Sequence, residues 1–193
     1  MKQDIDSPPP VARRSDRTRA VILEAARRRF ATHGFERTTI RAIAADADID
    51  PSMVMRYYGN KAQLFDAALD INLHLPDLSV VAADERAATL VRHFLRIWEQ
   101  DEANDALVLL LRSAVTNEQA AARMRAIFAA QVAPALAGPG GPKQVARAGL
   151  ASALLLGLAL TRYILCIPAV ADLSPEQVVA TLAPAIRVTL EQE

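Results

Sequence analysis

Apolar residues recur every three or four positions along most of the chain, and this period predicts helices rather than strands. Glycine, proline and helix-capping residues interrupt the pattern and divide it into segments. The composition agrees, because 52% of the residues are apolar and only 5% are aromatic. We therefore predict an all-α fold of about nine helices, which span approximately residues 15–34, 39–47, 51–57, 60–75, 85–100, 103–115, 117–137, 143–166 and 175–191.

Two changes in the pattern set the predicted domain organisation. Pro8, Pro9 and Pro10 lie among charged and small polar residues, which cannot bury enough surface to fold. Residues 1–14 are therefore predicted to form a disordered arm. The short helices that follow make a first domain at residues 15–61, and the longer apolar helices make a second domain at residues 62–193.

Charge is distributed unevenly, although the net charge is zero. Residues 13–61 contain 11 Lys and Arg against 6 Asp and Glu, whereas residues 62–193 contain 10 against 14. A basic domain attracts phosphate groups even when the whole chain is neutral. The asymmetry favours a polyanionic partner for the first domain, with solvated helix faces as the alternative interpretation.

Helix-start signals in the first domain describe a helix-turn-helix. Thr38 and Thr39 can cap the short second helix, and Asp50 followed by Pro51 can cap and begin the third. Two short helices joined by a tight turn place the second of them in the DNA major groove. The stretch DIDPSMVMRYYGNK is therefore predicted to contain a DNA-recognition helix.

The spacing of the third helix separates an inner face from an outer one. Ile49, Val54 and Tyr58 are spaced to face inward. Arginine pairs with guanine edges or phosphates, methionine contacts thymine methyl groups, and hydroxyls donate to phosphate oxygens. Gap-filling core is the alternative for the methionines. The outward residues are Ser52, Met53, Met55, Arg56 and Tyr57.

The stretch GFERTTIRAIAADADIDPSMVMRYYGNKAQLF resembles the N-terminal helix-turn-helix of TetR-family regulators. Asp48 stands where the family usually has a turn glycine, and aspartate tolerates the left-handed conformation of such a turn. Met55 stands where the family usually has a tyrosine, so that hydroxyl contact to phosphate is lost. The matching positions are Gly34-Phe35, Thr38-Thr39-Ile40, Ile43-Ala44, Pro51, Arg56-Tyr57-Tyr58, Asn60-Lys61 and Leu64-Phe65.

The resemblance implies a partner and a set of contact residues. Relatives bind a palindromic operator in double-stranded DNA as homodimers, and repression is the commoner outcome. A second recognition helix is also needed because one such helix buries too little surface for operator-level affinity. Thr39 and Lys61 also lie at helix N-termini, which favour phosphate, although a cap and a solvated charge are alternatives. The implied DNA contacts are Thr39, Arg41, Ser52, Met53, Met55, Arg56, Tyr57 and Lys61.

The last two predicted helices carry the candidate dimer surface. Small residues recur every four positions on the first of them, which lets a partner helix approach closely. Relatives usually form a four-helix dimer bundle here, and an internal core is the alternative. The candidate residues are Gly149, Ala153, Gly157, Val179, Leu182 and Ile186.

Apolar side chains in the middle of the second domain are predicted to line an effector pocket, because relatives bind small apolar molecules there. Plain core is the alternative for each residue. An effector that prefers a conformation with more widely separated DNA-binding domains would lower the affinity for DNA by its difference in affinity for the two conformations. The predicted helix at residues 60–75 would connect the two domains. The candidate lining residues are Phe94, Trp98, Leu107, Leu110, Leu111, Met124, Phe128 and Tyr163.

Other observations narrow the class of protein. Cys166 is a single cysteine and the N-terminus lacks an apolar signal sequence, so we expect a cytoplasmic protein without disulfides. The uncharged run from Ala148 to Thr161 has 14 residues, fewer than the roughly 18 to 20 of a membrane span, and is predicted to be a buried helix.

Two other functions remain open. An all-α enzyme is the first, although the three histidines lack metal-ligand spacing and only Arg147, Arg162 and Tyr163 suggest an anion site. The second is a DNA-binding regulator that needs no effector or that activates transcription. We expect no metal and no cofactor.

Overall fold

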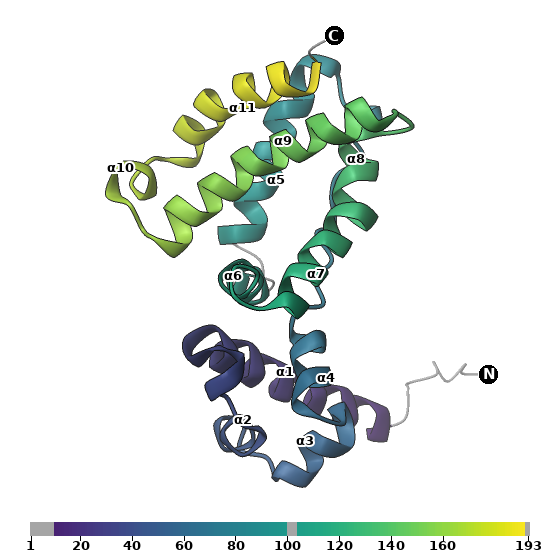
Figure 1. Cartoon of the computed structure of the whole chain (residues 1–193), viewed down its shortest axis with the longest axis vertical. Helices are drawn as coiled ribbons and strands as arrows, with labels where there is room; N and C mark the ends of the chain where they lie inside the picture. The colour runs from purple at the N-terminus through teal and green to yellow at the C-terminus, as the bar shows by residue number, and fades with distance from the viewer. Residues whose placement is uncertain (1–9, 100–103, 192–193) are drawn as a thin grey trace, which may run out of the picture. The chain divides into compact units, whose positions relative to one another are not determined.

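The computed structural model describes residues 10–99 and 104–191 (Figure 1). These ranges contain helices and connecting segments but no strand, so the predicted all-α class is confirmed. The α-helices are α1 Pro10–Arg37, α2 Ile40–Asp46, α3 Pro51–Tyr58, α4 Lys61–Ala68, α5 Arg86–Glu99, α6 Asn104–Ser113, α7 Glu118–Ile127, α8 Ala133–Ala137, α9 Pro142–Ala159, α10 Pro168–Ala171 and α11 Pro175–Glu191. The shorter segments are the 3₁₀ turns η1 Leu78–Val80 and η2 Ala83–Glu85 and the π-helical turns η3 Phe128–Val132 and η4 Leu160–Ile164.

The chain forms two compact units, Met1–Asp70 and Ile71–Glu193. The division follows α4 instead of preceding it at Lys61. The reason is aromatic packing: the ring of Phe65 in α4 lies 4.9 Å from that of Phe30 in α1 and 5.0 Å from that of Phe35. Helix α4 is therefore part of the core of the N-terminal unit.

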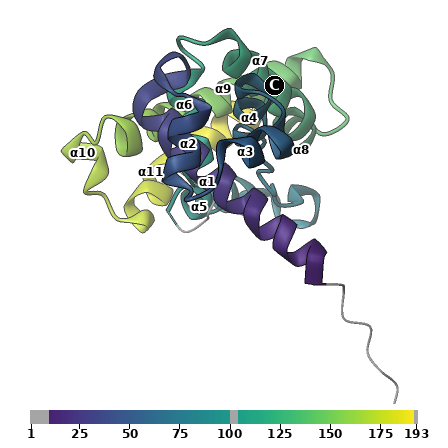
Figure 2. The same ribbon diagram turned by 90° about the horizontal axis from the view of Figure 1, so that it is seen from below.

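Helix α1 starts at Pro10, earlier than predicted. Residues 10–14 are helical, so the disordered arm is wrong over this part, and residues 1–9 lie outside the described residues. Gly34 ends the regular part of α1 at φ 75°, as predicted for a C-terminal cap. Figure 2 shows the first turns of α1, in purple, extending beyond the other helices of this unit.

Local capping chemistry holds α2 and α3 in place. Thr39 accepts a hydrogen bond from the amide of Ala42, and Asp50 accepts one from the amide of Ser52 at 2.8 Å. Asp48 adopts φ 53°, so aspartate occupies the left-handed turn position as expected. These contacts confirm the predicted helix starts and the tight turn.

Helix α4 ends at Ala68, so its predicted continuation to about residue 75 is wrong. Residues 71–77, which we call the extended segment, belong to the C-terminal unit and form no helix, and His74 among them has a left-handed φ of 44°. Gln131 of the same unit hydrogen-bonds this segment. The amide of Leu73 donates to Gln131 Oε1 at 2.8 Å, and Gln131 Nε2 donates to the carbonyl of Ile71 at 2.9 Å. Leu73 therefore fits a helical period in the sequence but lies in a segment that is not helical.

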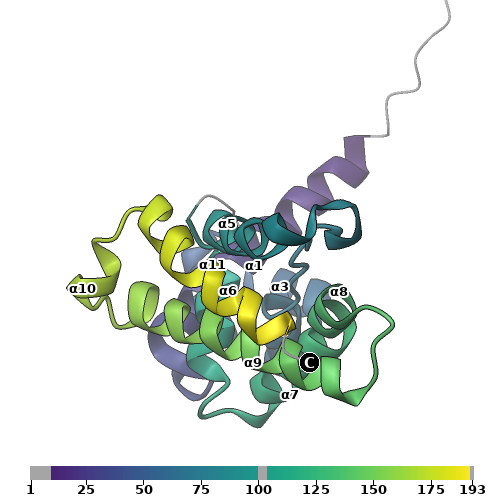
Figure 3. The same ribbon diagram turned by 90° about the horizontal axis from the view of Figure 1, so that it is seen from above.

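In the C-terminal unit, α11 packs against α5 and α9 (Figure 3). Helix α9 contributes alanines without exposed surface to the core of this unit, including Ala148 and Ala159, and α11 contributes Ile186. The predicted helix at 117–137 is continuous but includes the π-helical turn η3. The four-residue α10 was not predicted, because so short a segment has no periodic pattern.

Helix α9 and η4 form one run from Pro142 to Ile164 of 23 residues, with a mean hydropathy of 1.4 over its most apolar window. By length and composition alone, this run could cross a membrane, which differs from our expectation. It is weak support for a span, because core helices of soluble proteins share these properties. Only 22% of the window is buried within the chain, and Leu150 and Leu154 are among the exposed residues.

Candidate functional site

Helix α3 presents one apolar residue to the core and several others to solvent. Val54 has no exposed surface, and Tyr58 donates a hydrogen bond from its hydroxyl to the carbonyl of Arg19 at 2.9 Å. Met55 is 45% exposed, and Arg56 is also exposed. The structure therefore agrees with the prediction for Val54, Met55 and Arg56 and for the exposed Ser52. The other members of the two predicted faces are partly exposed: Ile49, Met53, Tyr57 and Tyr58.

Tyr57 is the centre of a polar cluster that also includes α1. The guanidinium of Arg19 lies 5.4 Å from the centre of the Tyr57 ring, and that of Arg56 lies 5.3 Å from it. Hydrogen bonds from Ser15 and then Arg56 to the phenol oxygen hold the pKa of Tyr57 below its ordinary value. Sequence reasoning missed Ser15 and Arg19, because only the tertiary packing of α1 on α3 brings them to Tyr57.

Ser52 is exposed, but its hydroxyl is already engaged. It donates to Asp50 Oδ1 at 2.5 Å, and this bond together with that from the Ser52 amide lowers the pKa of Asp50. A phosphate diester offers only acceptors, so Ser52 cannot donate to it while this bond persists. In this conformation Ser52 therefore stabilises the cap of α3 by its hydrogen bond to Asp50.

The other predicted contacts lie on α2 and α4. Thr39 and Arg41 are exposed at the start of α2. Lys61 is half-buried: its ammonium donates to the carbonyl of Phe35 at 2.9 Å and lies 4.2 Å from the centre of the Phe35 ring. It also donates to the carbonyl of Glu36 at 3.5 Å. An ammonium has three donors, so one of them remains for another acceptor.

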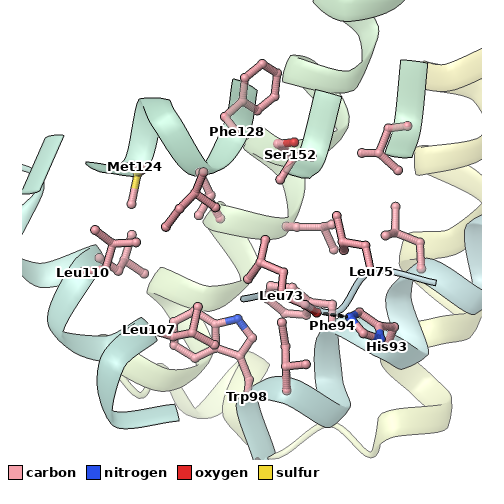
Figure 4. Close-up of a pocket in the computed structure, with 18 residues that line it drawn as sticks. Leu73, Leu75, His93, Phe94, Trp98, Leu107, Leu110, Met124, Phe128 and Ser152 are labelled. Atoms are coloured by element: carbon pink, nitrogen blue, oxygen red, sulfur yellow. Dashed lines mark hydrogen bonds between the residues drawn. The ribbon is translucent and has the colours of Figure 1, made fainter. Parts of the chain in front are cut away.

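The C-terminal unit contains an apolar cavity of about 140 Å³ (Figure 4). Seven of the eight predicted lining residues border it, all except Tyr163. Tyr163 instead stacks on Trp98, with ring centres 5.0 Å apart, and donates its hydroxyl to Glu99 at 2.9 Å. Burial and the Glu99 carboxylate raise the pKa of Tyr163.

The cavity also has lining residues that sequence reasoning missed. Leu73 and Leu75 come from the extended segment after α4, and His93 and Ser152 are the polar members of the lining. Leu73 and Leu75 could not be assigned from the sequence because the end of α4 was misplaced. The full lining is Leu73, Leu75, Leu90, His93, Phe94, Ile97, Trp98, Leu107, Leu110, Leu111, Met124, Ile127, Phe128, Val132, Leu136, Ser152, Leu155 and Leu156.

His93 joins the extended segment to α5. Its Nε2 lies 2.8 Å from the carbonyl oxygen of Leu73, and its Nδ1 lies 2.8 Å from Arg96 Nη2. A guanidinium only donates, so Nδ1 accepts from Arg96 and the proton sits on Nε2. His93 and Gln131 therefore hold the extended segment beside the cavity from two different helical segments.

The candidate dimer residues divide between surface and core. Ala153 and Gly157 are exposed on α9, and a side-chain carbon added at Gly157 would meet no atom within 4 Å. Gly149, Val179 and Leu182 are partly exposed. Ile186 has no exposed surface within its own chain, so its assignment to the dimer interface is wrong: it packs in the core of this unit.

Arg162, considered above as an anion site, is fully engaged within the chain. Its guanidinium pairs with Glu99 at 3.0 Å and donates to the carbonyls of Val170, Ala171 and Leu173. These bonds close the corner between η4 and α11 and contradict the anion site. Within residues 10–99 and 104–191, no three His, Cys, Asp or Glu side chains are grouped to hold a metal ion.

Two family models match the chain. The model for bacterial regulatory proteins of the tetR family covers residues 22–68, and the model for the tetracyclin repressor-like C-terminal domain covers residues 84–190. A curated relative, the HTH-type transcriptional repressor SCO4008 of Streptomyces coelicolor, is 42% identical over 59 residues. That match covers 31% of this chain and 31% of the relative, so it spans under a third of either protein.

Solved structures resemble almost the whole chain. A TetR-family regulator (SCO0857) from Streptomyces coelicolor A3 is 29% identical, with a TM-score of 0.64, and the match covers 97% of this chain and 99% of that one. A TetR-like transcriptional regulator from Rhodococcus sp. RHA1 is 19% identical, with a TM-score of 0.67, over 97% of this chain and 100% of that one. The second likeness is one of fold alone.

Proposed function

Because this chain belongs to the TetR family of bacterial regulatory proteins, we propose that it is a homodimeric repressor of transcription in the cytoplasm. It binds a palindromic operator in double-stranded DNA through the N-terminal unit. A small apolar effector in the cavity of the C-terminal unit releases it. The chain acts by binding alone and catalyses no reaction.

The observation that carries the DNA-binding proposal is the cluster around Tyr57. Arg19 and Arg56 each lie within 5.4 Å of the Tyr57 ring centre, and no described carboxylate forms an ion pair with either. Two adjacent cations without a counterion favour a phosphate group. Ser15 and Ser52 contact DNA only after their hydroxyls leave Tyr57 and Asp50. The other proposed contacts are Thr39, Arg41, Met53, Met55, Arg56, Tyr57 and Lys61, to which we add Arg19.

The test is fluorescence anisotropy of the purified chain on DNA from immediately upstream of its own gene. Scrambled DNA competes, and the salt concentration is fixed at about 150 mM because affinity depends steeply on salt. Arg56→Ala should weaken specific binding by roughly 5- to 150-fold, the loss of a contact of about 1–3 kcal/mol. Arg125→Ala, which removes the same charge from the exposed surface of α7, is the matched control and should change affinity by less than about twofold.

Equal losses in the two variants would show that the effect is only one of net charge. Binding that is no tighter than to scrambled DNA would show that the operator does not lie in the DNA immediately upstream of the gene. If binding were also insensitive to salt, the DNA-binding proposal itself would fail, because phosphate contacts release counterions.

Support for the effector comes from the cavity, since a regulator without an effector has no need of an apolar cavity that a small molecule could fill. Support for the dimer comes from α9. Leu150 is 62% exposed, Leu154 is 39% exposed, and both lie on the helix that carries Ala153 and Gly157. An apolar helix face with small residues suits close packing against a second copy. We therefore place the dimer contact on α9, with Val179 and Leu182 of α11 beside it.

A further inference from the structure

We propose that the cavity of the C-terminal unit binds an uncharged, mostly apolar molecule of about one-ring size whose hydrogen-bond acceptor takes the indole N–H of Trp98. This inference rests on the proposed function, because it names the chemical class of the effector for the same cavity. Size, charge and hydrogen-bonding capacity of the lining each contribute to it.

The volume of the cavity and the absence of charged residues from its lining limit the size and charge of a ligand. The cavity holds about 140 Å³, close to the roughly 150 Å³ of apolar cavities that stay dry and bind benzene. None of the 18 lining residues is Asp, Glu, Lys or Arg. A buried charge without a partner is very costly, so the lining excludes carboxylates and ammonium groups.

Besides Trp98, the lining has two polar side chains, Ser152 and His93, and both already donate their hydrogen to a backbone carbonyl. Ser152 donates its hydroxyl to the carbonyl of Ala148 at 2.7 Å. His93 donates from Nε2 to the carbonyl of Leu73 and accepts at Nδ1 from Arg96. A ligand therefore finds no donor at either residue.

Trp98 differs from these two residues. It is 3% exposed, and one face of its ring is covered by the parallel ring of Tyr163. Among the described residues, no acceptor takes its indole N–H. In Figure 4 the indole nitrogen lies on the edge of the ring that faces Leu73 and the interior of the lining. The nitrogen is not among the fully buried unpaired side-chain atoms of the described residues, so it keeps surface that a ligand can reach. Tryptophan N–H groups in largely buried positions usually find a hydrogen-bond partner, and an acceptor on a ligand would supply it.

The test uses three probes of similar size and different polarity: ethylbenzene, acetophenone and benzoate. Their affinities for the full chain are measured by isothermal titration calorimetry. Ethylbenzene and acetophenone should both bind, and benzoate should bind at least about 100-fold more weakly, because its charge would lose hydration without gaining a partner. Comparable affinity for benzoate would overturn the inference about charge.

The decisive comparison is between wild type and Trp98→Phe, which keeps an aromatic ring and removes the N–H. Acetophenone should lose roughly 3- to 10-fold in affinity, the range for one buried hydrogen bond, while ethylbenzene changes by less than about twofold. Tyr163→Phe is the control, since it keeps the ring stacked on Trp98 and lies outside the lining; it should leave the ratio of the two affinities unchanged.

Equal losses for both probes would mean that Trp98 only fills space, and the inference would fail while the cavity remained a ligand site. Binding of none of the probes to wild type would remove the effector from the proposed function as well, whereas operator binding is measured independently. If Trp98→Phe did not fold by circular dichroism, Trp98 labelled with ¹⁵N would serve instead. Its indole proton should shift on addition of acetophenone more than on addition of ethylbenzene, and equal shifts would count against the proposal.

Discussion

The two units of the chain fill their interiors in different ways. In the N-terminal unit Phe30, Phe35 and Phe65 contact one another directly, with ring centres between 4.9 and 6.0 Å apart. In the C-terminal unit Phe94 and Trp98 border an open cavity. Dense packing holds a surface in one geometry, whereas a cavity leaves room for a ligand and for rearrangement around it. The difference fits the proposed roles, in which the N-terminal unit binds DNA and the C-terminal unit binds an effector.

The largest expected difference between the units is the cost of removing a ring. Phe65→Ala should destabilise the N-terminal unit by about 3–5 kcal/mol, because Phe65 has no exposed surface. Phe128→Ala should cost less than about 2 kcal/mol, because Phe128 is half-buried and one side of it already faces the cavity. Hydrogen exchange resolved by peptide measures each unit separately, which matters because two units need not unfold together.

Similar costs for the two substitutions would contradict the proposed difference between the units, since both interiors would then be equally close-packed. A loss of exchange protection confined to the unit that carries each substitution would support it. Far-UV circular dichroism at the measuring temperature verifies that both variants remain helical.

A smaller effect is expected at the extended segment beside the cavity. Gln131→Leu keeps a side chain of similar size but removes the bonds to the carbonyl of Ile71 and the amide of Leu73. The segment should open more readily by about 1 kcal/mol, the lower end of the cost of leaving backbone groups unpaired, because both bonds are only partly buried. The measurement is the exchange rate of the Leu73 amide, and Gln144→Leu on the exposed start of α9 is the matched control. An unchanged Leu73 rate would show that Gln131 does not hold the segment.

The same contrast explains what could be predicted from the sequence. In the N-terminal unit Thr39, Asp50 and Asn60 cap helices through bonds to amides two or three residues away, so the signal lies in the local sequence. The end of α4 depends on Gln131, which is 58 positions from Leu73, and no local rule reports such a contact. The cavity was predicted in outline because its aromatic and leucine residues are apolar. Tyr163 was misplaced because its hydroxyl prefers Glu99, and Ile186 because an apolar stripe does not indicate whether it faces a core or a partner.

The smallest expected effect concerns a feature that the units share. Asp50 and Ser52 in one unit, and Asp77 and Ser79 in the other, form the same turn, in which the serine hydroxyl donates to the aspartate at 2.5 and 2.6 Å. In both turns the serine hydroxyl and then the serine amide lower the pKa of the aspartate. A lowered folded-state pKa means that the stabilisation is fully present above the ordinary aspartate pKa and is lost as the pH falls through the lowered value.

Ser52→Ala and Ser79→Ala remove the hydroxyl bond and leave the amide bond in place. Each should raise the pKa of its aspartate part of the way to the ordinary value, so the loss of stabilisation begins at higher pH. Carboxyl ¹³C shifts followed through an acid titration measure both groups in one protein. Because the geometry of the turn is local, the two shifts should be alike, despite the different interiors of the two units. A shift at Asp50 without one at Asp77 would mean that the surrounding unit, and not the three-residue turn, sets the pKa.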